Sequence, residues 1–324
     1  LCTVQHTSNL YFTAPDAQLA QLLCEKTGMK KVFFGNSGAE ANECAIKAAR
    51  AYGAAKHGND CYTILTLKNS FHGRTITTLA ATGQDVFHHD FTPLTEGFVY
   101  AEPNDLADLE QLIKTNKCAA VMMEVVQGEG GVMPLDEAYV KGAAKLCEEY
   151  DLLLICDEVQ VGNGRSGKLY GYMHYGIQPD IVSTAKGLAG GLPLGATLLG
   201  EKVQDVLSAG THGSTFGGNP VCCAGALSIL HRLDGPLLQS VQEKSDFIVD
   251  TLTGAPGIKS VTGLGLMLGV ETVRPVADVI CACAEQGVLV ISAKNKVRLL
   301  PALNIPMAQL EQAIGVLKAV CAEV

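Results

Sequence analysis

Short apolar runs alternate with helical patterns from about residue 33 to residue 232. We expect strands at 61–67, 118–126, 152–159, 180–185 and 195–200. Their unbroken apolarity suits strands that are covered on both faces. Helices are expected from Ser37, where Glu40 completes a capping box, from Asp136 to about Tyr150, and from Asn219-Pro220. The alternation predicts an α/β fold with a mostly parallel sheet and helices on both sides.

The pattern changes near Leu233, where "LDGPL" reads as a domain boundary. A helix to about Leu252 is expected next, followed by a glycine-rich stretch, a helix around 275–286, two strand-like runs and a C-terminal helix. The sequence therefore predicts a large domain over 1–233 and a smaller α+β domain over 234–324.

Composition excludes some classes of function. The net charge of −9 over 324 residues argues against nucleic acid or an anionic membrane as the main partner. No apolar stretch approaches the roughly 20 residues of a membrane span. The opening residues, "LCTVQHTSNLYF", do not begin with Met and lack the zones of a signal peptide.

Twelve cysteines are scattered along the chain, many of them within apolar segments. Neither Cys222-Cys223 nor the pair Cys281 and Cys283 has the spacing of a zinc site. The eight histidines show no HExxH spacing. These features favour reduced core cysteines in a cytoplasmic protein and predict no metal site.

Candidate chemistry gathers at the ends of the predicted strands, where open α/β sheets bind ligands. "LLLICDEVQ" ends in Asp157 and Gln160, and "DIVSTAK" ends in Lys186. Taken alone, Asp157 could cap a turn, and Lys186 could be an ordinary lysine whose stem reaches the surface. "FFGNSGAEAN" leads into a helix whose first N–H groups could seat a phosphate, although it matches neither the nucleoside triphosphate nor the dinucleotide motif.

Further segments add polar groups. "SFHGRT" places an aromatic residue, a histidine and Arg74 together, and "HGSTFGGNP" places Ser214 and Thr215 in a glycine-rich loop. Arg298 is the one charge in an apolar run and could bind a carboxylate through two parallel hydrogen bonds. Glu129, in "QGEGG", is a plausible partner for it.

Together these motifs resemble class III (subgroup II) aminotransferases, which use pyridoxal phosphate. The match includes "NSGAEANE", "FHGRT", "QGEGG", "DEVQVGNGRSG", "PDIVSTAKGLAGGLPLGA" and "HGSTFGGNP", and extends over nearly the whole chain. It implies the fold type I of pyridoxal-phosphate enzymes, with a mostly parallel seven-stranded sheet. The family usually carries a further N-terminal stretch that contributes to the small domain, so part of that domain is expected to be lacking here.

The resemblance also implies roles for residues that bind the cofactor. Lys186 would hold the cofactor as a Schiff base, Asp157 would pair with the ring nitrogen, Gln160 would approach the phenolic oxygen, and Phe71 would stack on the ring. The implied cofactor-binding set is completed by Ser37, Gly38, Ala39, Val159 and Thr215.

Further roles concern the substrates and the partner subunit. Thr215 would reach the phosphate in the neighbouring subunit, which implies a homodimer. Arg74 and Ser214 would bind the donor. Arg298 would hold the carboxylate of glutamate or 2-oxoglutarate, with Glu129 masking Arg298 for the other substrate.

The implied reaction moves the δ-amino group of N2-acetylornithine to 2-oxoglutarate, a step of arginine biosynthesis. Within the resemblance, His72 favours acetylornithine over ornithine as the donor. Ornithine, succinylornithine, 4-aminobutyrate and a carrier-linked lysine remain competing donors. An aminomutase of the glutamate-1-semialdehyde type and a regulator that binds the cofactor without turnover are competing functions.

Overall fold

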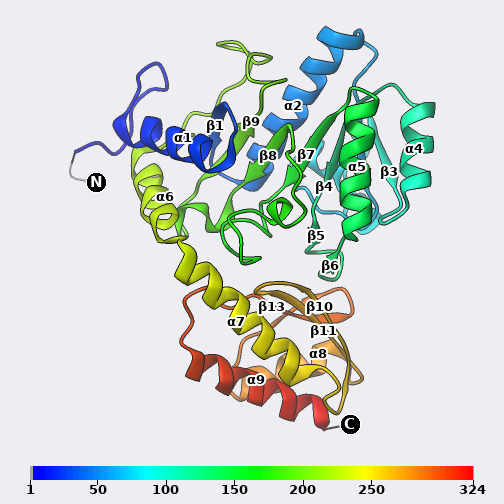
Figure 1. Ribbon diagram of the computed structural model, residues 1–324, viewed down its shortest axis with the longest axis vertical. Helices are drawn as coiled ribbons and strands as arrows, with labels where there is room; N and C mark the ends of the chain where they lie inside the picture. Colours follow the sequence, from blue (N-terminus) through cyan, green and yellow to red (C-terminus); the bar gives the residue numbers. More distant parts are fainter. Residues whose placement is uncertain (1–2, 324) are drawn as a thin grey trace.

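The computed structural model describes residues 3–323, which form two layered units (Figure 1). The larger one is built on a seven-stranded sheet and the smaller one on a four-stranded sheet. We refer to them as the large and the small domain. The described N-terminal residues lie beside the large domain, and the C-terminus lies at the far end of the small domain.

The large sheet is mostly parallel, with the strand order β1-β9-β8-β7-β4-β2-β3. Its strands are β1 (Lys31–Gly35), β2 (Thr63–Leu67), β3 (Phe98–Ala101), β4 (Cys118–Met123), β7 (Leu153–Asp157), β8 (Ile181–Thr184) and β9 (Gly195–Leu199). Strand β9 runs antiparallel to both of its neighbours. The fold class predicted from the sequence is confirmed.

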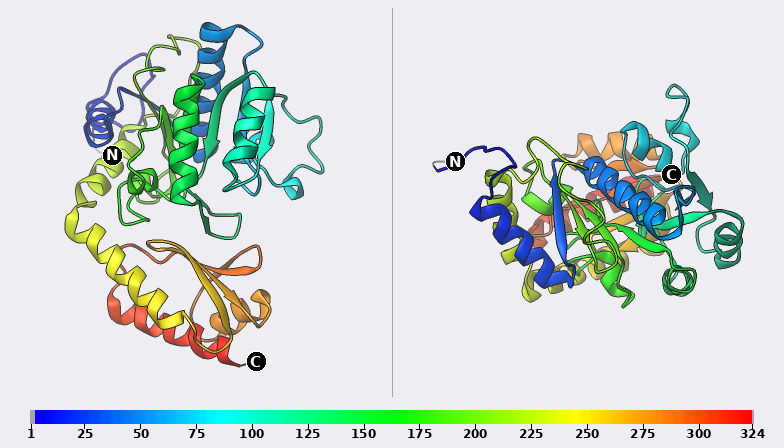
Figure 2. Two further views of the ribbon diagram at one scale, coloured as in Figure 1. Left: turned by 45° about the vertical axis from the view of Figure 1, so that its right-hand side comes forward. Right: turned by 90° about the horizontal axis from the view of Figure 1, so that it is seen from above.

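Both faces of this sheet are buried, which explains the unbroken apolar runs. Along β4, Ala120 and Met122 belong to the hydrophobic cluster on one face, whereas Val121 and Met123 belong to the cluster on the other. Because side chains alternate across a strand, both sets of positions of a doubly covered strand are buried, and most of them are apolar. The buried exceptions include small hydroxyl residues, such as Thr66, Ser183 and Thr197. Figure 2 (left) shows α5 on one side of the sheet and α2 on the other.

The large domain has six α-helices among the described residues. They are α1 (Ala14–Thr27), α2 (Gly38–His57), α3 (Ile76–Ala81), α4 (Leu106–Thr115), α5 (Glu137–Glu149) and α6 (Pro220–Arg232). Asn219 caps α6 by accepting from the N–H groups of Val221 and Cys222, as its sequence predicted. The structure adds α1, α3, α4, β1 and β3, which the apolar pattern did not predict.

Only one of the two hydrogen bonds of the capping box expected at Ser37 is formed. The Ser37 hydroxyl accepts from the N–H of Glu40, 3.2 Å away, and so caps α2. The Glu40 carboxylate accepts instead from the N–H of Asn36, one residue before the cap. Helix α2 therefore starts where the sequence indicated, but the Glu40 carboxylate accepts from the N–H of Asn36 and not from that of Ser37.

Helix α7 (Gly235–Leu252) passes from the large domain to the small one (Figures 1 and 2). Its first turn packs Leu237 and Leu238 against the core of the large domain, while Val241 and Ile248 belong to the second core. A boundary at 233/234 stays a prediction, since this one helix contributes to both cores.

The small domain has an antiparallel sheet in the order β10-β11-β13-β12. Its elements are β10 (Ile258–Leu264), β11 (Met267–Thr272), α8 (Val276–Glu285), β12 (Ile291–Ala293), β13 (Lys296–Leu299) and α9 (Met307–Ala322). Leu310, Ile314 and Leu317 of α9 pack into the second core. The two-stranded hairpin of β5 (Val126–Gln127) and β6 (Met133–Pro134) projects from the large domain toward β10.

Two further findings concern helices and cysteines. Among residues 3–323 no single helix is long and apolar enough to cross a membrane; α6 and α7 reach that length and apolarity only as a pair bent by 73°. All eleven cysteines of the described chain are free thiols, and Cys281 alone among them is exposed.

Candidate active site

A cavity of about 240 Å³ opens where the carboxyl ends of β4, β7 and β8 meet the start of α2. We call it the strand-end cavity. It is lined by Gly38, Ala39, Asn42, Phe71, His72, Gly73, Arg74, Glu124, Asp157, Val159, Gln160 and Lys186. Parallel strands bring their carboxyl ends to one edge of the sheet, which places residues from distant parts of the sequence around one space.

Lys186 projects into this cavity from the residue pair that follows β8. Its backbone is left-handed, with φ of 46°, a conformation that costs a residue with a Cβ some strain. The side chain is exposed to the cavity that it lines, yet desolvation by the surrounding protein lowers the pKa of its amine. The negative charges nearby oppose this lowering of the pKa, and they belong to Asp157, Glu124 and Glu129. The positive charge of Arg298 lowers the pKa further. A lysine with a lowered pKa is more readily neutral and nucleophilic.

Asp157 is the last residue of β7 and is 3% exposed. Its Oδ2 accepts hydrogen bonds from Asn42 Nδ2 and His72 Nδ1, each 2.8 Å long, and its Oδ1 accepts from the N–H of Val159 at 3.0 Å. With Asp157 as the acceptor, Nδ1 is the donating nitrogen of His72. Three donors thus hold the carboxylate in a single orientation.

The start of α2 forms one wall of the cavity. Gly38 packs so closely on Val159 that an added Cβ would lie 2.5 Å from its Cγ1. The first N–H groups of a helix have no partner within the helix and carry a partial positive charge, so they suit a phosphate. Gly38 and Ala39 line the cavity, while Ser37 remains outside it as the helix cap.

The loop after β2 supplies an aromatic face. The ring of Phe71 lies in the cavity wall, in edge contact with Phe87 at 5.5 Å between ring centres. The guanidinium of Arg74 is 5.3 Å from the centre of the Phe71 ring and is otherwise exposed at the rim. Arg74 is therefore free to meet a substrate that enters over the aromatic ring.

Arg298 reaches the same site from the small domain. One of its terminal nitrogens, NH1, lies 2.7 Å from Glu129 Oε1 and 3.2 Å from Gln160 Oε1. Gln160 Nε2 in turn lies 3.4 Å from Glu129 Oε1. We call these three residues the Arg298 cluster. They come from β13, from the β5–β6 hairpin and from the loop after β7, so the cluster joins the two domains.

The cluster leaves part of the arginine unused. Arg298 is 8% exposed, and its Nε is buried without a hydrogen-bond partner among the residues that the structure describes. The contact with Glu129 therefore uses a single guanidinium nitrogen and is not a bidentate pair. An incoming carboxylate could replace Glu129 and form the second bond as well.

Ser214 and Thr215 do not line the strand-end cavity of their own chain. Ser214 Oγ accepts from Asn36 Nδ2 at 2.9 Å, in front of α2, and Thr215 is exposed. The structure thus brings together ten of the sequence-predicted site residues in or beside the cavity, but it does not bring Ser37, Ser214 and Thr215 into its wall.

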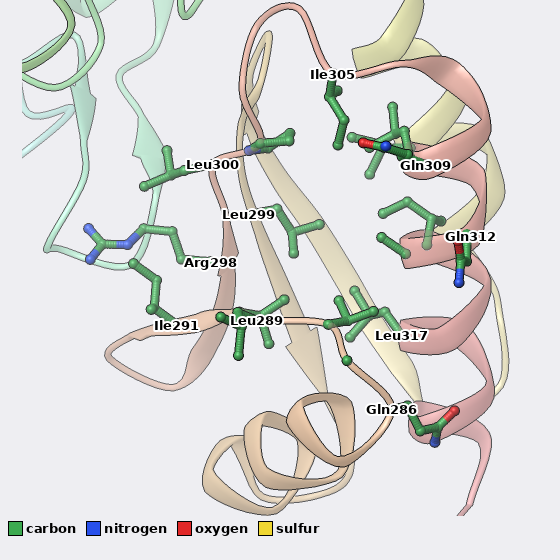
Figure 3. A pocket seen from close by; sticks show the side chains of 18 residues that line it. Gln286, Leu289, Ile291, Arg298, Leu299, Leu300, Ile305, Gln309, Gln312 and Leu317 are labelled. Carbon is green, nitrogen blue, oxygen red and sulfur yellow. The ribbon is translucent and has the colours of Figure 1, made fainter. Parts of the chain in front are cut away.

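A second cavity, of about 530 Å³, lies in the small domain between β12–β13 and α9. Its walls are mostly apolar, and Figure 3 shows Leu299 facing α9 while the side chain of Arg298 points away toward the large domain. This larger cavity therefore lacks the groups needed for chemistry. Within the described chain no group of three His, Cys, Asp or Glu side chains is arranged to hold a metal ion.

Comparison with known proteins decides the family to which this site belongs. Residues 1–321, nearly the whole chain, match the family described as aminotransferase class-III. The chain belongs to aminotransferase class III. Pyridoxal phosphate is the cofactor of this family, and transfer of an amino group from an amino donor to an oxo-acid is its reaction.

Class III relatives resemble the chain over most of its length. It is 51% identical to the acetylornithine aminotransferase of Haemophilus ducreyi, over 99% of this chain and 82% of that protein. It is 44% identical to the succinylornithine transaminase of Salmonella newport, over 93% and 76% of the two chains. The solved ornithine aminotransferase of Toxoplasma gondii superimposes with a TM-score of 0.93 at 32% identity, covering 98% of this chain and 79% of that one.

The groups in the strand-end cavity fit the cofactor of class III. Lys186 offers an amine, Asp157 a fixed carboxylate for the ring nitrogen, Phe71 an aromatic face, and the start of α2 N–H groups for the phosphate. Each of these chemical needs is met by a different element around one space. The chain's own residues therefore provide the donor set that pyridoxal phosphate requires.

Four residues that line the cavity were not predicted as site residues: Asn42, His72, Gly73 and Glu124. Asn42 and Glu124 contribute polar groups that were not singled out from the sequence. Asn42 lies on the buried face of α2, between Ala41 and Cys44, where an amide amid small apolar residues was the available signal. Glu124 follows β4, is 4% exposed, and accepts from the N–H of Phe71 at 2.9 Å. Burial raises the pKa of Glu124 to about 7, with His72 opposing the shift and Asp157 adding to it.

The structure gives His72 a place beside Asp157. Its side chain is fully buried and its Nδ1 lies 2.8 Å from Asp157 Oδ2, so it acts on that carboxylate. The use of His72 as a pointer to acetylornithine rather than ornithine stays a prediction.

Proposed function

We propose that the chain transfers the δ-amino group of N2-acetylornithine to 2-oxoglutarate, producing N-acetylglutamate 5-semialdehyde and glutamate in arginine biosynthesis. The acetylornithine aminotransferase of Haemophilus ducreyi, 51% identical over 99% of this chain, supports this donor. We further propose that the enzyme works in the cytoplasm as a homodimer. Thiol cysteines support the compartment, because disulfides are rare in the cytosol.

The Arg298 cluster is the observation that carries this proposal. An aminotransferase binds two different substrates in turn at one site, and 2-oxoglutarate has a second carboxylate to be held away from the reacting carbon. Arg298, paired with Glu129 at 2.7 Å, offers a carboxylate receptor that is covered by the protein's own carboxylate. A dicarboxylate can displace Glu129, while a donor that needs no such contact leaves the pair intact.

The reacting groups have separate tasks. When bound, pyridoxal phosphate supplies an electron sink for the carbon that loses and gains a proton. Lys186, with its lowered pKa, is placed to bind the cofactor and then to move that proton. Asp157 would hold the ring-nitrogen end through its fixed carboxylate, and Phe71 would support the ring face.

Donor binding would occur at the rim of the cavity. Arg74 stands there on the Phe71 and Phe87 rings, 5.3 and 6.0 Å from their centres, with its guanidinium exposed. Such a cation suits the carboxylate of an acylated amino acid. Ser214 would complete this subsite from the partner subunit, because in its own chain it lies in front of α2 and outside the cavity.

An exposed apolar surface supports the homodimer. Four large apolar side chains are exposed: Leu10 (87%), Tyr11 (69%), Phe12 (96%) and Phe216 (58%). The N-terminal segment that carries the first three contacts the loop that carries Phe216, through a hydrogen bond from Asn9 to the carbonyl of Ser214. Four large apolar side chains gathered in one region are a marker of an interface. Thr215, beside Phe216, would then be carried toward the partner's site.

A donor panel tests the proposal. Acetylornithine, succinylornithine, ornithine and 4-aminobutyrate are compared by kcat/KM with 2-oxoglutarate as acceptor, and acetylornithine is expected to give the highest value. A higher value for another donor would make that donor the substrate. Amino transfer that proceeds without any added oxo-acid would instead indicate an aminomutase.

A further inference from the structure

Asn42 connects parts of the site that lie far apart in the sequence. It stands one helical turn after Gly38, within the start of α2 that faces the cavity. Its Nδ2 donates to Asp157 Oδ2 at 2.8 Å and to the carbonyl of His72 at 2.7 Å. One amide group thereby joins α2, the end of β7 and the loop that carries Phe71.

The same amide is left half satisfied. Asn42 is 1% exposed, and its Oδ1 has no hydrogen-bond partner within residues 3–323. A buried carbonyl without a donor is costly, and most buried polar atoms avoid it. The unpaired Oδ1 is therefore a cost of having asparagine here, and what the residue provides in return is its two Nδ2 bonds, to Asp157 and to the His72 carbonyl.

The connection has a geometric consequence for the cofactor. Its phosphate would meet the start of α2, its ring nitrogen would meet Asp157, and its ring face would meet Phe71. These three contacts must keep fixed mutual distances, since pyridoxal phosphate is a nearly rigid molecule. Asn42 is bonded to two of the three elements and belongs to the third.

We propose that Asn42 is a positioning residue that sets the distance between the phosphate seat of α2 and the ring-nitrogen carboxylate of Asp157. It acts through Asp157 and the Phe71 loop, and the inference rests on the proposed cofactor chemistry. Asp157 Oδ2 accepts hydrogen bonds from both Asn42 and His72. Removing the Asn42 side chain takes away one of these donors, so the carboxylate can rotate more freely. Positioning errors of this kind reduce cofactor affinity and rate together.

The test measures cofactor binding as well as activity. Asn42→Ala and the isosteric Asn42→Leu are reconstituted with pyridoxal phosphate, and the dissociation constant is obtained from equilibrium dialysis and from the visible absorbance of the bound cofactor. We expect the dissociation constant to rise about tenfold and kcat to fall by a similar factor, with the KM of the donor changed less than about twofold.

Thr197→Val is the matched control. The Thr197 hydroxyl donates to the carbonyl of Ala41 at 2.7 Å, in the residue before Asn42, and does not touch the strand-end cavity. This variant removes one buried hydrogen bond to the same turn of α2. It is expected to lower the melting temperature while leaving the cofactor dissociation constant and the absorbance unchanged.

A double-mutant cycle decides between positioning and general packing. In an Asp157→Ala background, Asn42→Ala should change cofactor affinity by less than about twofold, since its partner is gone. An unreduced effect in that background, or an effect shared by Thr197→Val, would overturn the inference. A wild-type protein that binds the cofactor yet uses none of the panel donors would contradict the proposed function alone.

Discussion

Lys186 is the residue on which the proposed chemistry depends most. Its amine lines the strand-end cavity, and desolvation lowers its pKa. We expect Lys186→Ala to lower kcat by about three orders of magnitude or more and to abolish the absorbance of the covalently held cofactor. Lys202→Ala, at an exposed lysine 3.3 Å from Asp180, is the control and should keep full activity. Substantial turnover by Lys186→Ala would contradict the assignment.

Glu158 makes the stability of the protein depend on pH. It is fully buried and accepts from the N–H groups of Gly171 and Tyr172 at 2.7 and 2.8 Å. Burial raises its pKa to about 8, above the 4.5 of an unperturbed glutamate. The native state therefore holds a proton that the unfolded state has released, and its stability falls as pH rises from about 4.5 to 8.

Glu158→Gln isolates this dependence. The variant loses a constant amount of stability from one misdirected hydrogen bond, but it has no proton to release. The free energy of unfolding of the wild type should therefore fall relative to that of the variant between pH 5 and pH 8, with about 1.4 kcal/mol for each unit of pKa shift as an upper limit. Urea unfolding of the cofactor-free proteins measures it, and parallel curves would count against a raised pKa.

Two glycines within helices should respond to the same substitution in opposite directions. Gly315 is exposed in α9, and an added Cβ would meet no atom within 4 Å. In α2, a Cβ on Gly53 would lie 2.2 Å from the carbonyl oxygen of Cys61. Gly315→Ala should raise the free energy of unfolding by about 0.5–1 kcal/mol, whereas Gly53→Ala should lower it by about 1–3 kcal/mol.

Thermal or urea unfolding of both variants tests this contrast. A loss of stability in Gly315→Ala would show that α9 packs against something at that face. An unchanged Gly53→Ala would mean that α2 and the segment before β2 are less closely packed than the structure indicates.

The β5–β6 hairpin carries the acidic member of the Arg298 cluster. Glu129→Gln keeps the shape of the side chain and removes the charge that competes for Arg298, so the KM for 2-oxoglutarate should fall by about three- to tenfold. The donor half-reaction should become more sensitive to inhibition by 2-oxoglutarate. Glu102→Gln, at an exposed glutamate paired with Lys68, is the control. An unchanged or raised KM in Glu129→Gln would show that Glu129 does not compete for the arginine.

At the scale of the whole molecule, the proposed dimer makes a complementation test possible. Lys186→Ala and Thr215→Ala each damage a different component of the site. If Thr215 serves the partner's site, a mixed dimer contains one site with both native residues, and mixing the two inactive or impaired variants at low cofactor concentration should restore activity. If Thr215 serves its own chain, mixing should restore nothing.

The sequence was informative where the physical signal is local. Short, largely apolar runs predicted five strands of the large sheet, since burial on both faces favours apolar residues at successive positions. Caps at Ser37 and Asn219 predicted the starts of α2 and α6. This signal missed helices α1, α3 and α4 and the edge strands β1 and β3; the apolar run of β3, Phe98–Ala101, is only four residues long.

Motifs alone also placed Lys186 and Asp157 at strand ends. The signal is an apolar run followed directly by polar residues, and it can be read from neighbouring positions of the sequence. Tertiary structure decided which distant groups meet: Asn42 with Asp157, Gln160 with Arg298, and Thr215 outside the cavity of its own chain. Such contacts depend on how the sheet, α2 and the small domain pack, and packing is a property of many distant residues at once. For the same reason an asparagine within a helix pattern gave no sign, by itself, of the carboxylate that it holds.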